Sequence, residues 1–313
     1  MKSKPKHLID AKSLSSEDIM FFLETAQNFK LLSENHEAFP SLKGFAIANM
    51  FNDASSRLRF AFERAEKLLA CSSMSLTRTS ASPATGESME DVLRVLQSYE
   101  PDLIIVGDRH TGVPSKVARL SKAQVINAGD GINQNPAQAL ADLFAIWRQK
   151  GAFKDLRVGI VGDVKRSCIC GSLIPALKTL GAKVSVVAAP TMIPIHLQYL
   201  GVETVIGRIE DALPELDVVY MLPLQDCSLE QAPYPSLREY SMLYGLDRSK
   251  EHLLVKDALV MHPGPIRRGV EIDDYMAGHS RHSFIDSQSE TDIFACMAML
   301  YLLLKGGKDE HIA

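Results

Sequence analysis

The hydrophobic and polar positions of this chain follow two different periods. Short runs rich in β-branched residues predict strands, and they lie at 45–51, 71–77, 103–107, 124–129, 157–163, 183–189, 203–207, 218–222 and 258–263. Between them apolar positions recur at helical spacing, as at 19–32 behind a capping segment at 15–18. Continuous apolar strands separated by helices are typical of parallel sheets covered on both faces. The pattern predicts an α/β fold, and nine strands suit two doubly wound sheets better than one.

The predicted domain boundaries follow the restart of this pattern. A helix over 134–151 ends the first series of strands, and the run at 157–163 begins a new βα unit. The expected domains are therefore 1–148 and 149–286, linked by helices, followed by a C-terminal segment at 287–313. The apolar stretch 293–304 in that segment has no strand after it, so we expect it to pack back on the first domain. A chain of 313 residues is long enough for two such cores.

Composition narrows the class of protein. The formal net charge is −4 and no block of basic residues occurs, which argues against a nucleic-acid or membrane partner. The longest apolar segment is shorter than the ~20 residues that a membrane span needs, and the N-terminus lacks the apolar core of a signal peptide. The odd number of cysteines and their spacing predict reduced thiols in a cytoplasmic protein and no metal site: Cys71, Cys168, Cys170, Cys227 and Cys296.

Polar residues follow several of the predicted strands, where parallel sheets bind their ligands. Ser55, Ser56 and Arg57 stand between the first strand and a helix, and such a helix N-terminus suits an anion. Simple helix capping by the two serines is the alternative. Arg109 and His110 follow the third strand, and a solvated loop is favoured for them over a ligand site.

Three segments taken together resemble the aspartate and ornithine carbamoyltransferase family, and its aspartate branch in particular. They are the junction at 55–59, the segment AGDGINQNPAQALADLFAI at 128–146 and the segment MHPGPIRRGVEI at 261–272. The resemblance runs in register from about residue 45 to about residue 304. It implies a carbamoyl-phosphate-binding domain followed by an amino-acid-binding domain. It also implies homotrimers with shared active sites, and a reaction of pyrimidine biosynthesis that needs no metal or organic cofactor.

The resemblance implies a carbamoyl phosphate site that is only partly retained. The family residues that remain on this side are Ser55, Ser56, Arg57 and Gln138. The positions that have changed are Leu58 for a threonine, Thr85 for a lysine supplied by a neighbouring chain, Gly107 for an arginine, and Asn135 for a histidine. Asn135 is favoured as a helix cap, and Arg59 is expected to point inward as a structural ion-pair partner. Arg109 is a candidate substitute for the missing arginine.

The amino-acid side departs further from the family. Cys168 and Pro223 stand where the family has arginines, so both are degenerate substrate-binding positions. Gln225 is retained, as are Gly264 and Pro265, whose family contacts to substrate run through the backbone. His262 is favoured as a structural histidine that shapes its loop, and Arg267 is a second candidate substitute.

Two hypotheses of different classes follow. A carbamoyltransferase with a rebuilt site or a different amine acceptor would keep the carbamoyl phosphate side and change only the amine side. A non-catalytic relative, or pseudoenzyme, would lose both. Both sides are altered here, which favours the second hypothesis. It predicts weak binding of phosphate or carbamoyl phosphate, and association with an active paralogue or with other pyrimidine-pathway subunits.

Overall fold

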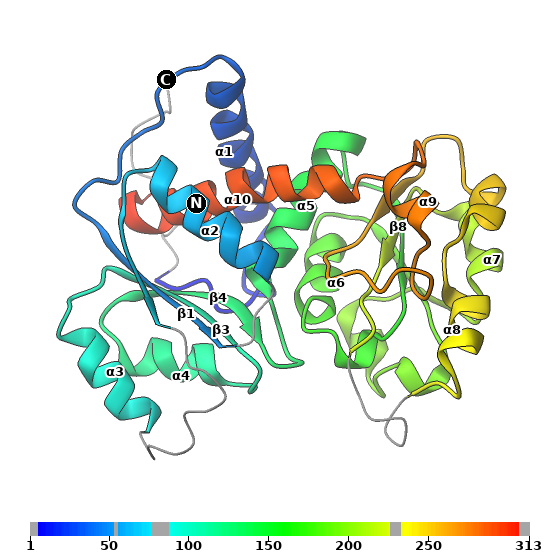
Figure 1. Cartoon of the computed structure of the whole chain (residues 1–313), viewed down its shortest axis with the longest axis horizontal. Helices are drawn as coiled ribbons and strands as arrows, with labels where there is room; N and C mark the ends of the chain where they lie inside the picture. The colour runs from blue at the N-terminus through cyan, green and yellow to red at the C-terminus, as the bar shows by residue number, and fades with distance from the viewer. Residues whose placement is uncertain (1–5, 53–55, 77–87, 226–232, 307–313) are drawn as a thin grey trace. The chain divides into compact units, whose positions relative to one another are not determined.

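A computed structural model describes residues 6–52, 56–76, 88–225 and 233–306 of the chain (Figure 1). The chain divides into two compact units. Unit 1 is formed by residues 1–144 together with 291–313, and unit 2 by residues 145–290.

Unit 1 is built on a four-stranded parallel sheet with the order β2-β1-β3-β4. Its strands are β1 (Ala46–Asn52), β2 (Ser72–Leu76), β3 (Leu103–Asp108) and β4 (Gln124–Asp130). Its helices are α1 (Ser16–Glu34), α2 (Ser56–Leu68), α3 (Met89–Gln97) and α4 (Val113–Leu120). Two further helices, α5 (Pro136–Lys150) and α10 (Ile285–Lys305), belong partly to unit 1 and partly to unit 2.

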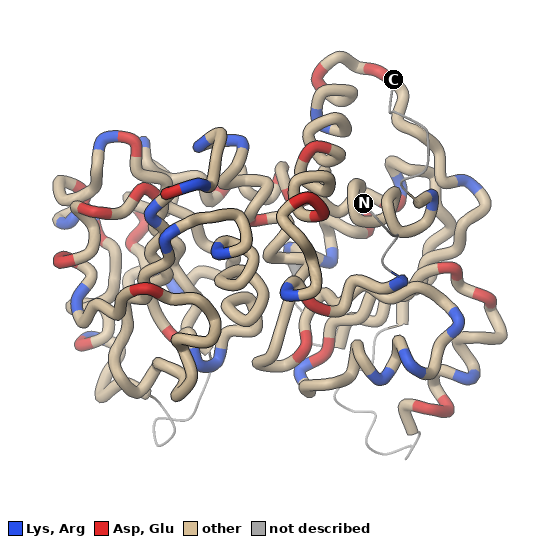
Figure 2. The backbone as a smooth tube through the Cα atoms, turned by 180° about the vertical axis from the view of Figure 1, so that it is seen from behind, with Lys and Arg blue, Asp and Glu red and all other residues tan. Residues whose placement is uncertain are grey.

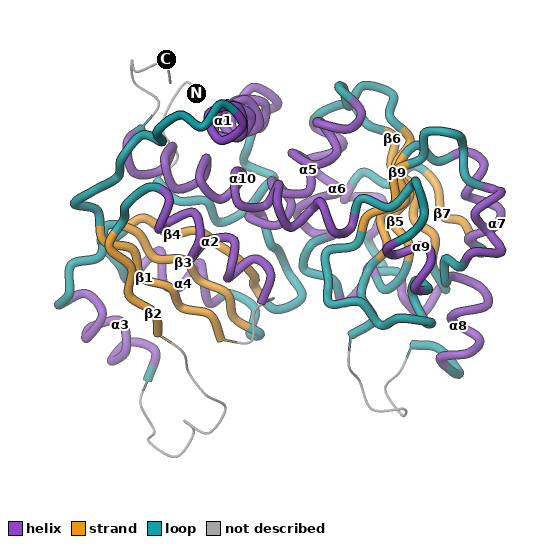
Figure 3. Tube along the Cα trace, turned by 45° about the horizontal axis from the view of Figure 1, so that its top comes forward, coloured by secondary structure: helices purple, strands orange, loops and turns teal. Residues whose placement is uncertain are grey.

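Helices cover both faces of this sheet. The helices α3 and α4 lie on one face, and α2 and α10 lie on the other (Figure 3). On the first face Leu93 and Val117 pack into one buried cluster with the strand residues Ala48 and Ile104. Burial on both sides explains why β1 and β3 are nearly continuous apolar runs rather than alternating, whereas β2 at the edge is largely exposed.

Unit 2 contains a five-stranded parallel sheet with the order β7-β6-β5-β8-β9. Its strands are β5 (Arg157–Val161), β6 (Lys183–Val187), β7 (Thr204–Ile206), β8 (Val218–Met221) and β9 (Leu259–Met261). Its helices include α6 (Cys170–Thr179), α7 (Ile209–Ala212), α8 (Leu237–Tyr244) and α9 (Asp274–Gly278). The helix α6 covers one face of the sheet, while α7 and α8 lie beyond the other (Figure 3).

The predicted fold class and all nine predicted strands are confirmed. The last helix is longer than the sequence pattern suggested, because α10 begins at Ile285, ahead of the apolar stretch. Its C-terminal part packs back on unit 1, where the rings of Tyr301 and Phe29 are 5.7 Å apart and Phe294 lies under Lys30. In the part of the chain that the structure describes, no helix has the length and apolar character to cross a membrane.

The strand order places a topological switch point in each unit. In unit 1 β1 lies between β2 and β3, and in unit 2 β5 lies between β6 and β8, so the connections from these neighbours run to opposite sides. Ligands of open parallel sheets bind beyond the carboxyl ends of the strands at such points. The loops that follow β1, β3, β5 and β8 are therefore the first places to look for chemistry, and Arg109, Cys168, Pro223 and Gln225 lie there.

Candidate functional site

The first turn of α2 carries a buried ion pair. Arg57 is the second residue of α2, and its Nε donates to Oδ2 of Asp292 on α10 at 2.5 Å. The Arg57 side chain is 15% exposed and the Asp292 side chain is 0% exposed. Burial raises the pKa of Asp292, whereas the Arg57 guanidinium lowers it. Arg57, which the sequence suggested as a cation for binding an anion, is therefore already paired with a carboxylate inside unit 1.

The neighbours of Arg57 also differ from expectation. Arg59 was predicted to be an inward structural ion-pair partner. The ion pair is confirmed, because its Nε pairs with Glu63 one turn along α2, but the inward direction is wrong, because both side chains are about one-third exposed. Leu58 is fully buried and belongs to the core of unit 1. Helical periodicity explains why Arg57 rather than Arg59 points inward, because successive residues of a helix project about 100° apart around the axis. Ser55, the Ser56 side chain and Thr85 lie outside the described residues.

A second buried polar cluster lies against the same helix. The carboxylate of Glu66 on α2 accepts hydrogen bonds from Nδ2 of Asn49 at 2.9 and 3.0 Å, and also from the hydroxyl of Ser73. Burial raises the pKa of Glu66, and the two hydrogen-bond donors lower it by a smaller amount. This cluster ties the C-terminal part of α2 to β1 and β2.

The raised pKa of Glu66 predicts a pH effect on stability. The folded state binds the Glu66 proton more tightly than the unfolded state, so this contribution is fully present below the usual carboxyl pKa of 4.5. It is lost as the pH rises through the raised folded value. We therefore expect the free energy of unfolding of the Glu66→Gln variant to fall less steeply with rising pH than that of the parent protein. Urea titrations between pH 4 and pH 7 measure the two slopes, with Glu63→Gln as the control, and equal slopes would contradict the assignment.

The loops after β3 and β4 are folded around two buried carboxylates. Asp108 accepts hydrogen bonds from Nδ2 of Asn52 at 2.9 Å and from the backbone of His110 at 2.8 Å. Asp130 accepts from the backbone of Gly112 at 2.5 Å and from Nδ2 of Asn133 at 2.7 Å. The carboxyl edge of this sheet is consequently acidic beside Gly107, which has no side chain to offer an anion.

Close packing between the same two loops requires a glycine. Gly131 has φ +58°, and a Cβ at this position would lie 2.5 Å from the Thr111 hydroxyl and 2.9 Å from the Arg109 carbonyl. Its N–H donates to the Asp108 carbonyl at 2.8 Å. The loop after β3 is thus held close to the loop after β4.

Arg109 and His110 occupy the exposed part of this loop. Both side chains are exposed, and Nδ1 of His110 lies 2.9 Å from Oδ1 of Asp108. The observed position agrees with the solvated loop that the sequence favoured. Arg109 remains a proposal as a substitute for the missing arginine.

The polar residues at the start of α5 are bonded to the protein itself. Oδ1 of Asn135 accepts the backbone N–H of Gln138 at 3.0 Å, and its Nδ2 donates to the Ala128 carbonyl. The prediction that Asn135 caps this helix is confirmed, and Pro136 follows at its first position, where a missing N–H costs nothing. Nε2 of Gln138 donates to Asp142 at 3.2 Å, and both residues are buried.

The loop after β5 in unit 2 has a related arrangement. Asp163 caps the following turn and pairs with Arg166 at 3.0 Å, and burial raises the pKa of Asp163 while Arg166 lowers it. Cys168 is half-buried, and Cys170 is buried at the start of α6, where burial raises the pKa of its thiol to about 12. At neutral pH the Cys170 thiol is protonated, so it offers no negative charge and little nucleophilicity.

A fully buried carboxylate organises the two remaining loops of unit 2. Glu271 accepts the backbone N–H of Leu224 at 2.6 Å and that of Arg267 at 2.8 Å. Its Oε2 also lies 3.1 Å from Nε2 of His262. Because Nδ1 of His262 accepts the N–H of Gly264 at 2.9 Å, the ring proton resides on Nε2 and is donated to Glu271. The prediction that His262 is structural is confirmed.

The other predicted residues of the amino-acid side lie on the loops that Glu271 holds. Pro223 lies two residues after β8 and is half-buried, and Gln225, two residues further on, is exposed. Gly264 and Pro265 follow β9, and Arg267 is half-buried. Glu271 brings the two loops together, but it supplies no positive charge at Cys168 and Pro223, where the resemblance implies arginines.

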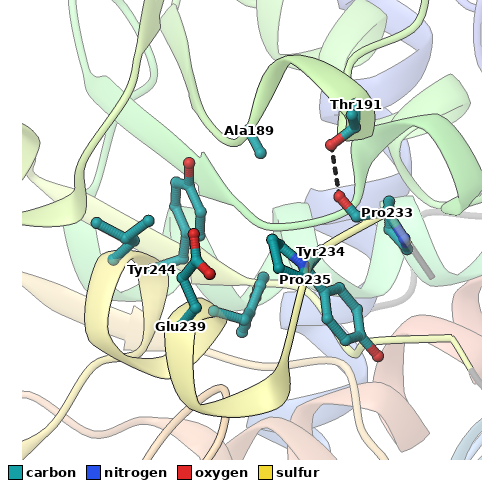
Figure 4. A pocket seen from close by; sticks show the side chains of 9 residues that line it. Ala189, Thr191, Pro233, Tyr234, Pro235, Glu239 and Tyr244 are labelled. Atoms are coloured by element: carbon teal, nitrogen blue, oxygen red, sulfur yellow. Dashed lines mark hydrogen bonds between the residues drawn. The ribbon is translucent and has the colours of Figure 1, made fainter. Parts of the chain in front are cut away.

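A pocket of about 510 Å³ lies in unit 2, beyond the carboxyl end of β6 (Figure 4). Three tyrosines and two prolines give it apolar walls, and the hydroxyl of Thr191 donates to the carbonyl of Pro233 at its edge. Its lining residues are Ala189, Thr191, Pro233, Tyr234, Pro235, Glu239, Tyr240, Leu243 and Tyr244. None of the residues that the sequence singled out lines this pocket.

Charge is otherwise mixed over both units. Acidic and basic residues are interspersed along the trace, without a block of one sign (Figure 2). Among the described residues, no group of three or more histidine, cysteine, aspartate or glutamate side chains is placed to hold a metal ion.

Sequence reasoning assigned no role to the buried acidic residues of these sites, among them Asp108, Glu271 and Asp292. Asp108 follows a predicted strand directly, and this position was a usable signal. Asp292 interrupts the apolar pattern just before the stretch 293–304, and a charged residue on a buried helix calls for a partner. Nothing local identified that partner, because Arg57 lies 235 residues away.

Comparisons with known proteins agree with the fold and with the order of the two domains. Residues 6–148 match the family described as aspartate/ornithine carbamoyltransferase, carbamoyl-P binding domain, and residues 154–303 match the corresponding Asp/Orn binding domain. The aspartate carbamoyltransferase catalytic subunit of Syntrophotalea carbinolica is 39% identical over 98% of both chains. That of Acetivibrio thermocellus is also 39% identical, over 99% of both chains.

Solved structures of carbamoyltransferases are similar to this chain in fold. The catalytic subunit of M. jannaschii aspartate transcarbamoylase is 29% identical, with a TM-score of 0.83 over 98% of this chain and 100% of that one. Aspartate transcarbamoylase from Trypanosoma cruzi in complex with carbamoyl phosphate shares the fold at a TM-score of 0.87, with 24% identity over 96% of each chain.

Proposed function

Because this chain belongs to the aspartate/ornithine carbamoyltransferase family, we propose that it is a non-catalytic or very weak member of that family's aspartate branch. It keeps the fold and a remnant of the phosphate site, and it serves as a non-catalytic subunit or paralogue of an active enzyme. The reaction that it no longer supports is the attack of the aspartate amine on carbamoyl phosphate, which releases phosphate and carbamoyl aspartate.

The end of β3 is the observation that carries this proposal. The family resemblance places an arginine at Gly107, where positive charge would stabilise the carbonyl oxygen as negative charge develops on it. The structure has a glycine there, and the adjacent residue is the buried carboxylate of Asp108. A carboxylate at this position would oppose negative charge rather than stabilise it.

Three further observations support it. Asn135 and Gln138 form hydrogen bonds within the start of α5, so these polar side chains stabilise the helix. Arg57 pairs with Asp292. On the amino-acid side, a thiol and a proline replace two guanidinium groups, and neither can pair with a carboxylate.

The alternative is an active carbamoyltransferase with a rebuilt site or another amine acceptor. The high identity to chains named catalytic subunits favours it. Assaying the purified protein for carbamoyl aspartate, and for carbamoylation of other amino acids, separates the two proposals. We expect no turnover with aspartate.

We also propose that the chain forms a homotrimer, because the family resemblance implies active sites shared between neighbouring chains. The apolar strands and helices that form both cores are intact, so loss of catalytic residues leaves assembly unaffected. Analytical ultracentrifugation at micromolar concentration should give the mass of three chains. A monomer at that concentration would exclude a role in assembly.

A further inference from the structure

We propose that Asp292 is an internal anion that occupies Arg57 and so weakens the binding of phosphate at the first turn of α2. The inference deepens the proposed function and rests on it for the statement that this junction is a remnant of a phosphate site. It adds a residue on α10, far from the junction in sequence, as the group that limits the affinity of that site.

The geometry of the pair supports this role. The Nε–H of Arg57 points at Oδ2 of Asp292 over 2.5 Å, which is in the range of a strong charge-assisted hydrogen bond. Because the carboxylate is 0% exposed, water does not screen it from the guanidinium. An anion arriving from solvent meets a guanidinium whose Nε–H is already donated and whose charge is already partly compensated by Asp292, so the anion gains less from Arg57 than from an uncompensated guanidinium.

The position of the carboxylate supports it too. The N-terminal turn of a helix carries free N–H groups and the positive end of the helix dipole, so it favours an anion. The first turn of α2 has no acidic residue of its own. Asp292 brings a carboxylate from α10 to the side chain of Arg57, the second residue of this helix. Its negative charge therefore compensates the same positive charge that a bound phosphate would compensate.

The arrangement also explains why Asp292 is tolerated in an apolar helix. Its neighbours on α10 include the buried Ala295 and Cys296, and an unpaired carboxylate there would be costly. Pairing with Arg57 offsets that cost, and burial leaves the carboxylate few other partners. The ion pair that stabilises unit 1 thus engages the positive charge of Arg57 that a phosphate would otherwise use.

Titration calorimetry with inorganic phosphate at constant ionic strength tests the proposal on the full-length chain. The variants are Asp292→Asn, which keeps an acceptor oxygen but removes the charge, and the double variant Arg57→Gln/Asp292→Asn. Glu63→Gln is the matched control, because it removes a carboxylate from the other arginine pair of the same helix, on the exposed side.

We expect phosphate to bind about tenfold more tightly to Asp292→Asn, as the release of one charge-assisted contact implies. The gain should be absent in the double variant and in Glu63→Gln.

Three results would overturn the inference: an unchanged affinity in Asp292→Asn, an equal gain in Glu63→Gln, or a gain that persists without Arg57. If Asp292→Asn fails to fold, the parent protein still decides the matter through the NMR signal of the Arg57 Nε–H group, assigned by its loss in Arg57→Lys, which keeps a cation beside Asp292. The signal should stay unchanged as phosphate is added, and a shift on addition would show that Asp292 does not retain Arg57. Turnover of aspartate by the parent protein would refute the proposed function and leave these phosphate affinities as a separate result.

Discussion

Purified protein supplied with carbamoyl phosphate and aspartate should form carbamoyl aspartate at a rate on the order of 10⁶-fold below that of a typical enzyme, which turns over about ten times per second. One well-placed donor to a developing oxyanion contributes about 3 kcal/mol of barrier reduction. The arginine, histidine and lysine replaced at Gly107, Asn135 and Thr85 would together account for about 8 kcal/mol. The sum indicates scale only, because groups that act as a unit are not additive.

The aspartate side lowers the expected rate further. Its two carboxylates need cationic partners in a fixed geometry, and the residues at the corresponding positions are Cys168 and Pro223. Raising the aspartate concentration should offset weak aspartate binding but should not restore the rate, because the groups replaced at Gly107, Asn135 and Thr85 would act on carbamoyl phosphate. This distinguishes lost chemistry from weak binding alone, which a high substrate concentration would overcome.

A colorimetric assay of carbamoyl aspartate measures this rate, with the catalytic subunit of Syntrophotalea carbinolica as the positive control under the same conditions. Turnover near one per second would refute the proposal. In that case Arg109→Ala and Arg267→Ala identify the substitute, since each is a cation on a loop that follows a strand end. Loss of activity in one of them would show that its loop has rebuilt the site.

The fold was predictable because most of the strands are buried on both faces, although β2 and β7 are largely exposed. Burial on both faces requires uninterrupted apolar runs, and such runs stand out in the sequence, as at β3 and β5 where nearly every residue is buried. Turn residues and helix caps are likewise local, which is why Asn135 was identified as a cap. Local signals therefore determined the elements, the parallel sheets and the order of the two domains.

The buried polar contacts were not predictable, because their partners lie far apart in the chain. Arg57 and Asp292 are separated by 235 residues, and Glu271 and Leu224 by 47 residues. The error at Arg59 has the same origin. Both arginines stand in the first turn of α2, where the helical spacing points them in different directions, and the inward one is the arginine that faces the carboxylate on α10.

Replacing Glu271 by alanine should destabilise unit 2 by about 3–5 kcal/mol, the largest stability effect that we expect in this chain. The substitution leaves the N–H groups of Leu224 and Arg267 and the ring N–H of His262 without their acceptor. Glu271 and His262 are both 0% exposed, so water cannot readily replace the carboxylate. A cost of this size corresponds to a lowering of the melting temperature by about 10 °C.

Thermal unfolding followed by circular dichroism measures this effect, with Glu203→Ala as the control because Glu203 is an exposed carboxylate of the same unit. The control should shift the melting temperature by no more than about 1–2 °C. Equal shifts in the two variants would show that the loops after β8 and β9 do not depend on the buried carboxylate. A large shift confined to Glu271→Ala would mean that the buried carboxylate still maintains the backbone of the loops after β8 and β9. On the proposed function, retention of this stabilising network is expected, because a non-catalytic member would still need its fold for assembly.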